Sequence, residues 1–155
     1  MRSVADFYQD CQAVAHAVPP LDVKLADAVS CVLAEDVQAP FNLPVADLSA
    51  CDGYAVRVRD CEGATLETPV TLPVTEEIRA GAVDPAALVP GTAIRIASGA
   101  PMPTGAEAVV SLEFTDHGVA QVALRTAPAS GENIRRRAED VAQGETVLRA
   151  GTRIG

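Results

Sequence analysis

Aromatic residues are scarce in this 155-residue chain, and tryptophan is absent. The few aromatic side chains are Phe7, Tyr8, Phe41, Tyr54 and Phe114. The core must therefore come from aliphatic residues, among which valine is abundant. Because β-branched side chains suit a pleated surface, this composition favours strands. The length fits one average domain, or one small domain with an appendage.

Positive charge and long apolar runs are also scarce. A net charge of −9 argues against nucleic acid and against an anionic membrane surface as partners, because both attract clusters of Lys and Arg. No apolar run approaches the ~18–20 residues that span a bilayer. The N-terminus carries Arg2, Asp6 and Asp10 and has no continuous hydrophobic region typical of a signal peptide. We therefore expect a cytoplasmic protein.

Closely spaced metal ligands are missing as well. The cysteines form no C-x-x-C pair, and the only thiols and imidazoles are Cys11, Cys31, Cys51, Cys61, His16 and His117. Zinc sites use closely spaced ligand pairs, so we expect no zinc site at these thiols. Without an export signal we expect them to be reduced. The sequence also defines no Ser/His/Asp or Cys/His triad.

A helix is predicted over residues 3–18. Ser3 is the expected N-cap, and Asp6 completes a capping-box-like arrangement. Apolar residues from Val4 to Val18 recur at i, i+3, i+4 and i+7 spacing, which indicates one apolar stripe that we interpret as a packing face. The pair Pro19-Pro20 is expected to end the helix.

Short apolar runs separated by turn clusters follow residue 49. Their length and spacing predict a small antiparallel barrel or sandwich over residues 50–130. The runs are Ala55–Val58, Val70–Val74, Thr92–Ala97, Ala108–Leu112 and Val119–Leu124. Gly118 is expected to supply the positive φ of a hairpin tip at residues 116–118. With further short strands at residues 21–25 and 146–148, the predicted fold class is α+β, mainly β with one helix.

Residues 49–56, Ser-Ala-Cys-Asp-Gly-Tyr-Ala-Val, are the first candidate for chemistry. Asp52-Gly53 is typical of a turn, because Asp tolerates the left-handed conformation and Gly adopts positive φ without steric cost. Two interpretations stay open at this point. The stretch is either a strand entry or a turn that holds a carboxylate at the rim of a site.

Two other segments and one glutamate are further candidates. Residues 135–140 place three arginines beside two carboxylates, and such groups grip phosphate and hold Mg²⁺, although a solvated charged segment has the same composition. Ser98 begins a Gly-rich bend whose N–H groups could face an anion, although a stiff Pro-containing turn is the simpler interpretation. Glu113 follows the run Ala108–Leu112 and could equally be an exposed carboxylate at a strand end.

Together these segments resemble the MoeA-type molybdopterin molybdenumtransferases, whose eukaryotic relatives include the C-terminal domain of gephyrin. Residues 49–56 are similar to the signature SAMDGYAV, and residues 95–103 (RIASGAPMP) to the stretch RI-x-TGAPVP. Residues 133–140 (NIRRRAED) match NIRRRGED closely. Residues 33–37, 105–110 and 150–152 also fit in order, so the resemblance covers essentially the whole chain.

The resemblance implies an enzyme of molybdenum cofactor biosynthesis that inserts molybdate into adenylylated molybdopterin, with Mg²⁺ and release of AMP. It implies a homodimer in the full-length protein. It also implies a linker-like domain, residues 1–49 and 131–155, that contributes to dimerisation and an inserted β-rich domain, residues 50–130. The pterin-binding α/β domain is absent from this chain, which ends on a strand-like run, so we expect a fragment of a longer polypeptide that is inactive alone. The alternative is a self-standing β-rich binding or dimerisation module.

Site residues follow from the same resemblance. Asp52 and Asp140 match active-site aspartates of the family and are expected to hold Mg²⁺, which requires both to line one cleft. Arg135 matches an arginine of that cleft, and Ser98 stands where threonine is usual; both are expected to bind substrate. The departures from the family pattern remove no carboxylate or arginine; they are Ala46, Leu48, Cys51 and Ala138.

Overall fold

A computed structural model describes residues 2–16 and 18–155. The chain divides into two compact units. Unit 1 comprises Met1–Val37 and Leu148–Gly155, and unit 2 comprises Gln38–Val147. The domain boundaries expected near residues 50 and 130 stay predictions. Within the described ranges, no helix has both the length and the apolar character needed to cross a membrane.

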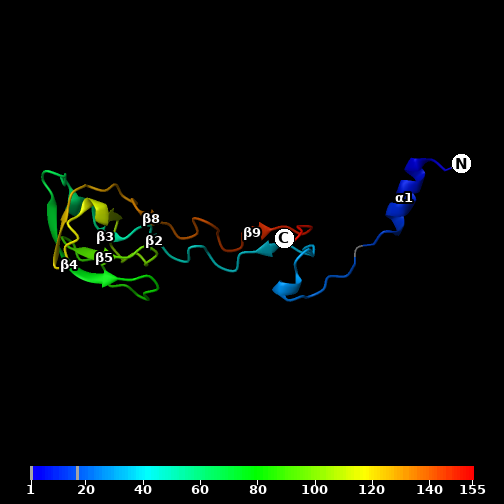
Figure 1. Cartoon of the computed structure of the whole chain (residues 1–155), viewed down its shortest axis with the longest axis horizontal. Coiled ribbons are helices and arrows are strands. Elements are labelled where there is room, and N and C mark those ends of the chain that lie inside the picture. Colours follow the sequence, from blue (N-terminus) through cyan, green and yellow to red (C-terminus); the bar gives the residue numbers. More distant parts are fainter. Residues whose placement is uncertain (1, 17) are drawn as a thin grey trace. The chain divides into compact units, whose positions relative to one another are not determined.

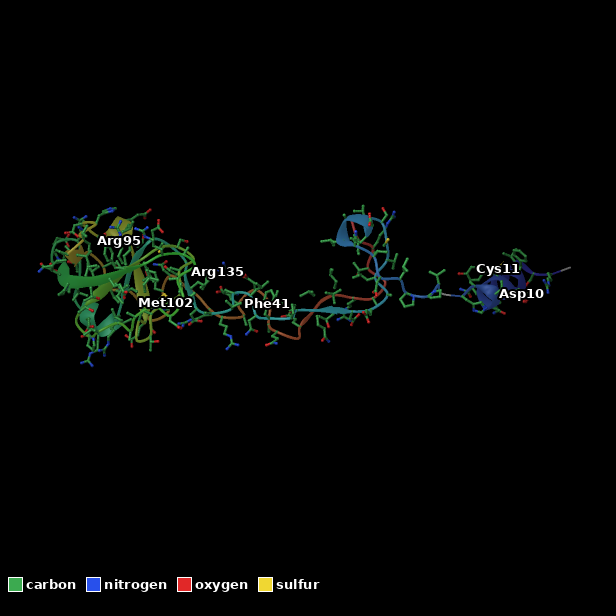
Figure 2. All side chains as sticks on the ribbon, turned by 90° about the horizontal axis from the view of Figure 1, so that it is seen from below. Asp10, Cys11, Phe41, Arg95, Met102 and Arg135 are labelled. Carbon is green, nitrogen blue, oxygen red and sulfur yellow. The ribbon has the colours of Figure 1, made fainter. Side chains whose placement is uncertain are left out.

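Unit 1 begins with the helix α1, Val4–Val14. The capping box is confirmed: Ser3 Oγ accepts a hydrogen bond from Asp6 N at 3.1 Å, and Ser3 N donates to Asp6 Oδ2 at 3.2 Å. The helix ends before the predicted boundary because Ala15 is extended, with φ −79° and ψ 118°; Ala17 lies outside the described residues. No residue of α1 is buried, and the side chains of Asp10 and Cys11 stand out from it in Figure 2.

The rest of unit 1 is held by backbone pairing. After the 3₁₀ turn η1, Leu25–Asp27, residues 30–33 exchange backbone hydrogen bonds with residues 151–154. The strand predicted at residues 21–25 is wrong, since residues 21–24 have no regular structure and no described residue pairs with them in a ladder. The predicted strand at 146–148 is confirmed as β9, Thr146–Leu148, which pairs with β1, Val37–Gln38; the division between the two units falls within both of these strands.

Unit 2 is built on a five-stranded sheet in the order β6-β3-β5-β4-β7 (Figure 1). Each strand falls on or beside one of the predicted apolar runs: β3 (Gly53–Val56), β4 (Val70–Ile78), β5 (Ala93–Ile96), β6 (Ala108–Ser111) and β7 (Gln121–Leu124). Thr115, which follows β6, forms a bridge with Leu124 of β7, so the sheet curls until its two edges approach. Mainly β with one helix is therefore confirmed as the fold class.

One feature of the predicted sheet is wrong. The sheet is mixed rather than antiparallel, because β4 and β5 run parallel. Residues 79–92 connect them, which is the length of crossover that a parallel pair requires. The β4–β5 register also shifts between Val74 and Glu76, as at a β-bulge.

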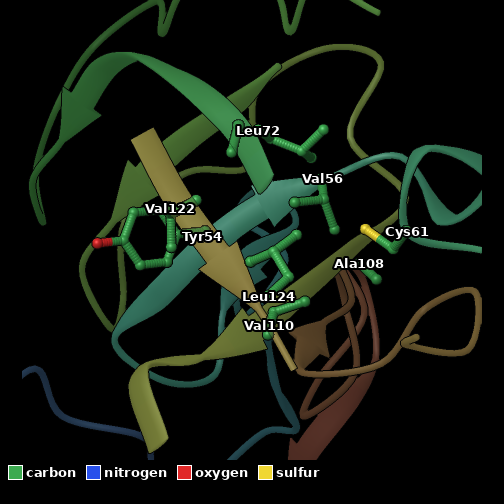
Figure 3. Packing of buried hydrophobic residues seen from close by; sticks show 9 residues of the cluster. Tyr54, Val56, Cys61, Leu72, Ala108, Val110, Val122 and Leu124 are labelled. Carbon is green, nitrogen blue, oxygen red and sulfur yellow. The ribbon is translucent and has the colours of Figure 1, made fainter. Parts of the chain in front are cut away.

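Two apolar clusters cover the two faces of the sheet. Tyr54 and Val56 of β3 belong to one cluster, and Ala55 between them belongs to the other, as the period of two along a strand requires. Figure 3 shows Tyr54 beside Val122 and Val56 near Cys61 in the first cluster. The Tyr54 hydroxyl donates to Gly118 O at 2.8 Å, which satisfies the one polar group of this buried ring.

The prediction that Gly118 supplies the positive φ of the loop before β7 is wrong. His117, not Gly118, adopts the positive φ of 60°. Gly118 is required instead for close approach, since a Cβ there would lie 1.7 Å from Gln121 O. Asp116 Oδ1 accepts from Gly118 N at 3.1 Å and from Ala123 N at 2.9 Å, and so fixes the loop.

Candidate functional site

Asp52 lies in the bend that leads into β3. Its Oδ1 accepts a hydrogen bond from Ser98 N at 2.7 Å, and Ser98 Oγ donates to Ala50 O at 3.3 Å. The structure thus brings together two of the predicted site residues, Asp52 and Ser98. Gly53 is the first residue of β3 and is buried without a positive φ. Residues 49–56 are therefore a strand entry, and Asp52 sits on the bend before it.

Arg135 and Asp140 form the second predicted pair. Arg135 lies in β8, Ile134–Arg135, opposite Leu48 of β2, Leu48–Ser49. The Arg135 guanidinium donates to Asp140 Oδ2 and forms an ion pair with it. Both side chains are about half exposed, so the pair is open to solvent and to a ligand.

The segment between Arg135 and Asp140 is a tight turn. Arg136 N donates to Glu139 Oε2 at 2.8 Å, and Glu139 N donates to Arg136 O at 3.1 Å. Ala138 adopts a left-handed φ of 63°, at the position where the resemblance expects glycine. Glu139 is thus occupied in building the turn, which leaves Arg135 and Asp140 at its two ends.

Asp47 holds this turn from outside, and no sequence motif pointed to it. Its carboxylate accepts from Arg136 Nη1 and from Arg137 N, both at 2.8 Å. The pKa of the Asp47 carboxyl is lowered, chiefly by the hydrogen bond from Arg137 N and further by the Arg136 guanidinium, against the opposing effect of burial. Asp47 is therefore an ionised anchor for the arginine segment.

The three motifs meet along β2. On one side Ser49 pairs with Ile134 of β8; on the other Ser49 N donates to Ala100 O at 2.9 Å, and Gly99 N donates to Ser49 O at 2.8 Å. One step further, Ala50 N donates to Asn133 O at 2.9 Å. Residues 49–56, 95–103 and 133–140 are therefore neighbours in space, although far apart along the chain.

Asp52 and Asp140 are held by different partners. No hydrogen bond joins their carboxylates to a common group, and residues 2–16 and 18–155 contain no cluster of three or more His, Cys, Asp or Glu placed to hold a metal ion. A site in which these two aspartates share a metal thus stays a prediction.

A hollow of about 140 Å³ opens beside Asp52. Its polar side chains besides Asp52 are Glu77 of β4 and Arg95 of β5, and Leu112 completes the wall. Arg95 was part of a recognised motif, but Glu77 carried no sequence signal, because only strand pairing brings it to the hollow.

Cys51 and Glu113 lie near the same place. The pKa of the Cys51 thiol is raised, first by burial and then by the charge of Asp52, with a smaller contribution from Glu113. A hydrogen bond with Ser111 opposes the shift. Glu113 therefore acts electrostatically on the side chain next to Asp52, and the Cys51 thiol stays protonated at neutral pH.

Comparisons with known proteins give matches over nearly the whole chain. The family described as the MoeA N-terminal region (domain I and II) matches residues 2–155. Molybdopterin molybdenumtransferase 2 of Mycobacterium tuberculosis (strain H37Rv) is 51% identical over 151 residues, which cover 97% of this chain and 37% of that protein. The molybdopterin molybdenumtransferase of Bacillus subtilis (strain 168) is 40% identical over 136 residues, 85% of this chain and 32% of that protein.

A solved structure has the same fold. The molybdopterin biosynthesis moeA protein from Pyrococcus horikoshii OT3 superposes with a TM-score of 0.80 and 39% sequence identity, covering 86% of this chain and 35% of that one. The chain thus spans about a third of the length of the relatives that it matches.

Proposed function

The chain belongs to the family of MoeA N-terminal regions, and from that premise we propose that it contributes one part of the active cleft of a molybdopterin molybdenumtransferase. The reaction is insertion of molybdate into adenylylated molybdopterin with release of AMP, a step of molybdenum cofactor biosynthesis. The observation that carries the proposal is the meeting of three motif segments along β2: Asp52 lies in a bend that a hydrogen bond joins to the turn containing Ser98, and Arg135 lies in β8, which pairs with β2.

In this proposal each residue of the chain has a separate task. Ser98 N orients the Asp52 carboxylate by donating a hydrogen bond to its Oδ1. Arg135 uses one terminal nitrogen for Asp140 and keeps other N–H donors for the phosphate oxygens of the substrate. A cation fixed beside the leaving phosphate offsets the negative charge that develops there.

The donor set also fits the Mg²⁺ that the resemblance implies. Asp52 Oδ1 and Asp140 Oδ2 are occupied by Ser98 N and Arg135, and each carboxylate keeps its second oxygen. Mg²⁺ usually takes only one or two carboxylates together with substrate phosphates. When bound, the ion would neutralise charge on the pyrophosphate-like bond of the substrate.

The same proposal includes the domain organisation and the oligomeric state of the full-length protein. The region of residues 1–49 and 131–155 serves as a linker-like domain that contributes to a homodimer in the cytoplasm, and residues 50–130 form the inserted β-rich domain. In this proposal the pterin-binding α/β domain lies outside these 155 residues, which correspond to 37% of the Mycobacterium tuberculosis relative. On its own, the 155-residue chain is therefore expected to lack transferase activity, and molybdate insertion by it would contradict this division of the cleft.

Removal of one carboxylate at a time tests the assignment. In the longer protein, Asp52→Asn or Asp140→Asn should lower molybdenum insertion by about 100-fold or more while the fold persists. Glu67→Gln is the matched control, because Glu67 is exposed in a loop outside the motifs and loses the same charge. Turnover is measured with adenylylated molybdopterin and molybdate, and the fold by circular dichroism. Near-normal turnover in both aspartate variants would refute the roles assigned to Asp52 and Asp140.

A further inference from the structure

A partly buried arginine faces the hollow beside Asp52. Arg95 lies in β5 between Tyr54 of β3 and Glu77 of β4, to which it is opposite in register. Within the described part of the chain, its guanidinium makes no ion pair and no side-chain hydrogen bond within the usual limits, whereas Glu77 pairs with Arg79 at 3.6 Å. Arg95 and Arg135 belong to different strands of unit 2 (Figure 2).

The register shift in β4 creates this arrangement. Val74 pairs with Ala93, and after the shift Glu76 pairs with Ile94 and Glu77 with Arg95. Without the extra residue, Glu76 rather than Glu77 would stand opposite Arg95. The charge of Arg95 also acts on the Tyr54 hydroxyl: burial raises the pKa of Tyr54, and Arg95 opposes that rise. Arg95, which is partly buried, therefore interacts electrostatically with the hydroxyl of its cross-strand neighbour Tyr54.

We propose that the hollow lined by Asp52, Glu77 and Arg95 is a subsite for a phosphate group, which Arg95 binds through its guanidinium. A planar guanidinium fits phosphate oxygens with two parallel hydrogen bonds, and partial burial reduces the screening of its charge. The ligand class rests on the proposed function, in which the substrate carries a pyrophosphate-like link to AMP.

The two carboxylates in the hollow determine how tightly it binds such a ligand. Asp52 and Glu77 repel a free anion, whereas Arg95 attracts it, so the subsite binds free pyrophosphate weakly and becomes stronger when one carboxylate is neutralised. Glu77→Gln is therefore expected to tighten binding of the anion.

Titration of the 155-residue chain with inorganic pyrophosphate, followed by amide NMR in the presence of a chelator, tests the proposal. The shifts should be centred on Gly53, Ile96 and Ala97, which line the hollow. Arg95→Gln should weaken binding by about tenfold or more, and Glu77→Gln should tighten it about threefold. Arg95→Lys keeps the charge, and its affinity for pyrophosphate should lie between those of the wild type and Arg95→Gln. Arg59→Gln, in the 3₁₀ turn Val58–Cys61, is the control for net charge.

Three results would overturn the subsite: no shift at the amides of the hollow, shifts confined to residues 134–140, or binding by Arg95→Gln equal to that of the Arg59→Gln control. Should Arg95→Gln lose its dispersed amide spectrum, Arg95→Lys and Glu77→Gln decide the question. The proposed function is judged separately, by turnover in the longer protein. If the longer protein shows normal turnover but the hollow does not bind pyrophosphate, only the subsite is refuted. If the longer protein is inactive but pyrophosphate binds in the hollow, only the proposed function is refuted.

Discussion

Replacement of Gly53 by alanine tests why glycine follows the site aspartate. A Cβ at this position would lie 2.1 Å from Val110 O and 2.9 Å from Val110 C, both backbone atoms of the neighbouring strand β6. A methyl group has no rotamer that avoids the contact, so β3 and β6 must move apart where Gly53 and Tyr54 pair with β6. Overpacking of a core typically costs about 1–3 kcal/mol. Because the clash here is with backbone, we expect about 3 kcal/mol for Gly53→Ala.

Urea unfolding measures this cost. A loss of about 3 kcal/mol should lower the midpoint by about 1–2 M for a protein of this size. Gly63→Ala is the control, since Gly63 has φ +78° and no atom within 4 Å of the added Cβ, which isolates the conformational cost of about 1–2 kcal/mol. The Ser98 amide, which donates to Asp52, should also shift in the NMR spectrum of Gly53→Ala. A Gly53→Ala variant as stable as the wild type would refute the argument from close approach.

Three further outcomes are expected. Ala138→Gly should raise the free energy of unfolding by about 0.5–1 kcal/mol, because Ala138 has a φ of 63°, and a lower melting temperature would contradict this. The pKa of Asp116 is lowered, first by the hydrogen bond from Ala123 N. A lowered folded-state pKa stabilises above the unfolded pKa, and this stability is lost as the pH falls through the folded value. Asp116→Asn should thus destabilise at neutral pH, and the difference from wild type should vanish in acid denaturation curves; a difference that persists in acid would contradict the charge effect. Burial, and then the charge of Asp60, raises the pKa of the Cys61 thiol to about 11. A thiol reagent should therefore label the exposed Cys11 and Cys31 in the folded chain and Cys61 only after unfolding, which mass spectrometry of the labelled peptides would show.

The strands of unit 2 could be predicted from the sequence because each apolar run is short and bounded by turn residues. Their direction could not, because an apolar run carries no information on the strand beside it. The parallel pair β4–β5 is an example: the connection of residues 79–92 permits either orientation. Glycine is ambiguous in a similar way. Gly53 and Gly118 both suggested positive φ, whereas both are required by the close approach of a carbonyl oxygen.

The same distinction applies to the candidate site, where residues in contiguous motifs could be predicted and residues placed by tertiary contacts could not. Asp52, Ser98, Arg135 and Asp140 were found because they lie in contiguous motifs, and the structure pairs the first two and the last two. Asp47 and Glu77 had no motif around them. Asp47 reaches the arginine turn through a backbone N–H, and Glu77 reaches Arg95 through a register shift in β4. Contacts of these two kinds depend on tertiary structure, which local spacing does not encode.

The position of Asp52 depends less on its own bend than on the two-residue strand β2 that precedes it. Ser49 is buried, its backbone pairs with Ile134 on one side and bonds Gly99 and Ala100 on the other, and its hydroxyl donates to Cys51 O at 2.6 Å. These contacts fix the chain on both sides immediately before Asp52. The Ser49 hydroxyl is therefore committed to the backbone and unsuited to act as a nucleophile. The chemistry of the signature Ser-Ala-Cys-Asp resides in its last residue, and its first residue holds that carboxylate in place between the two other motifs.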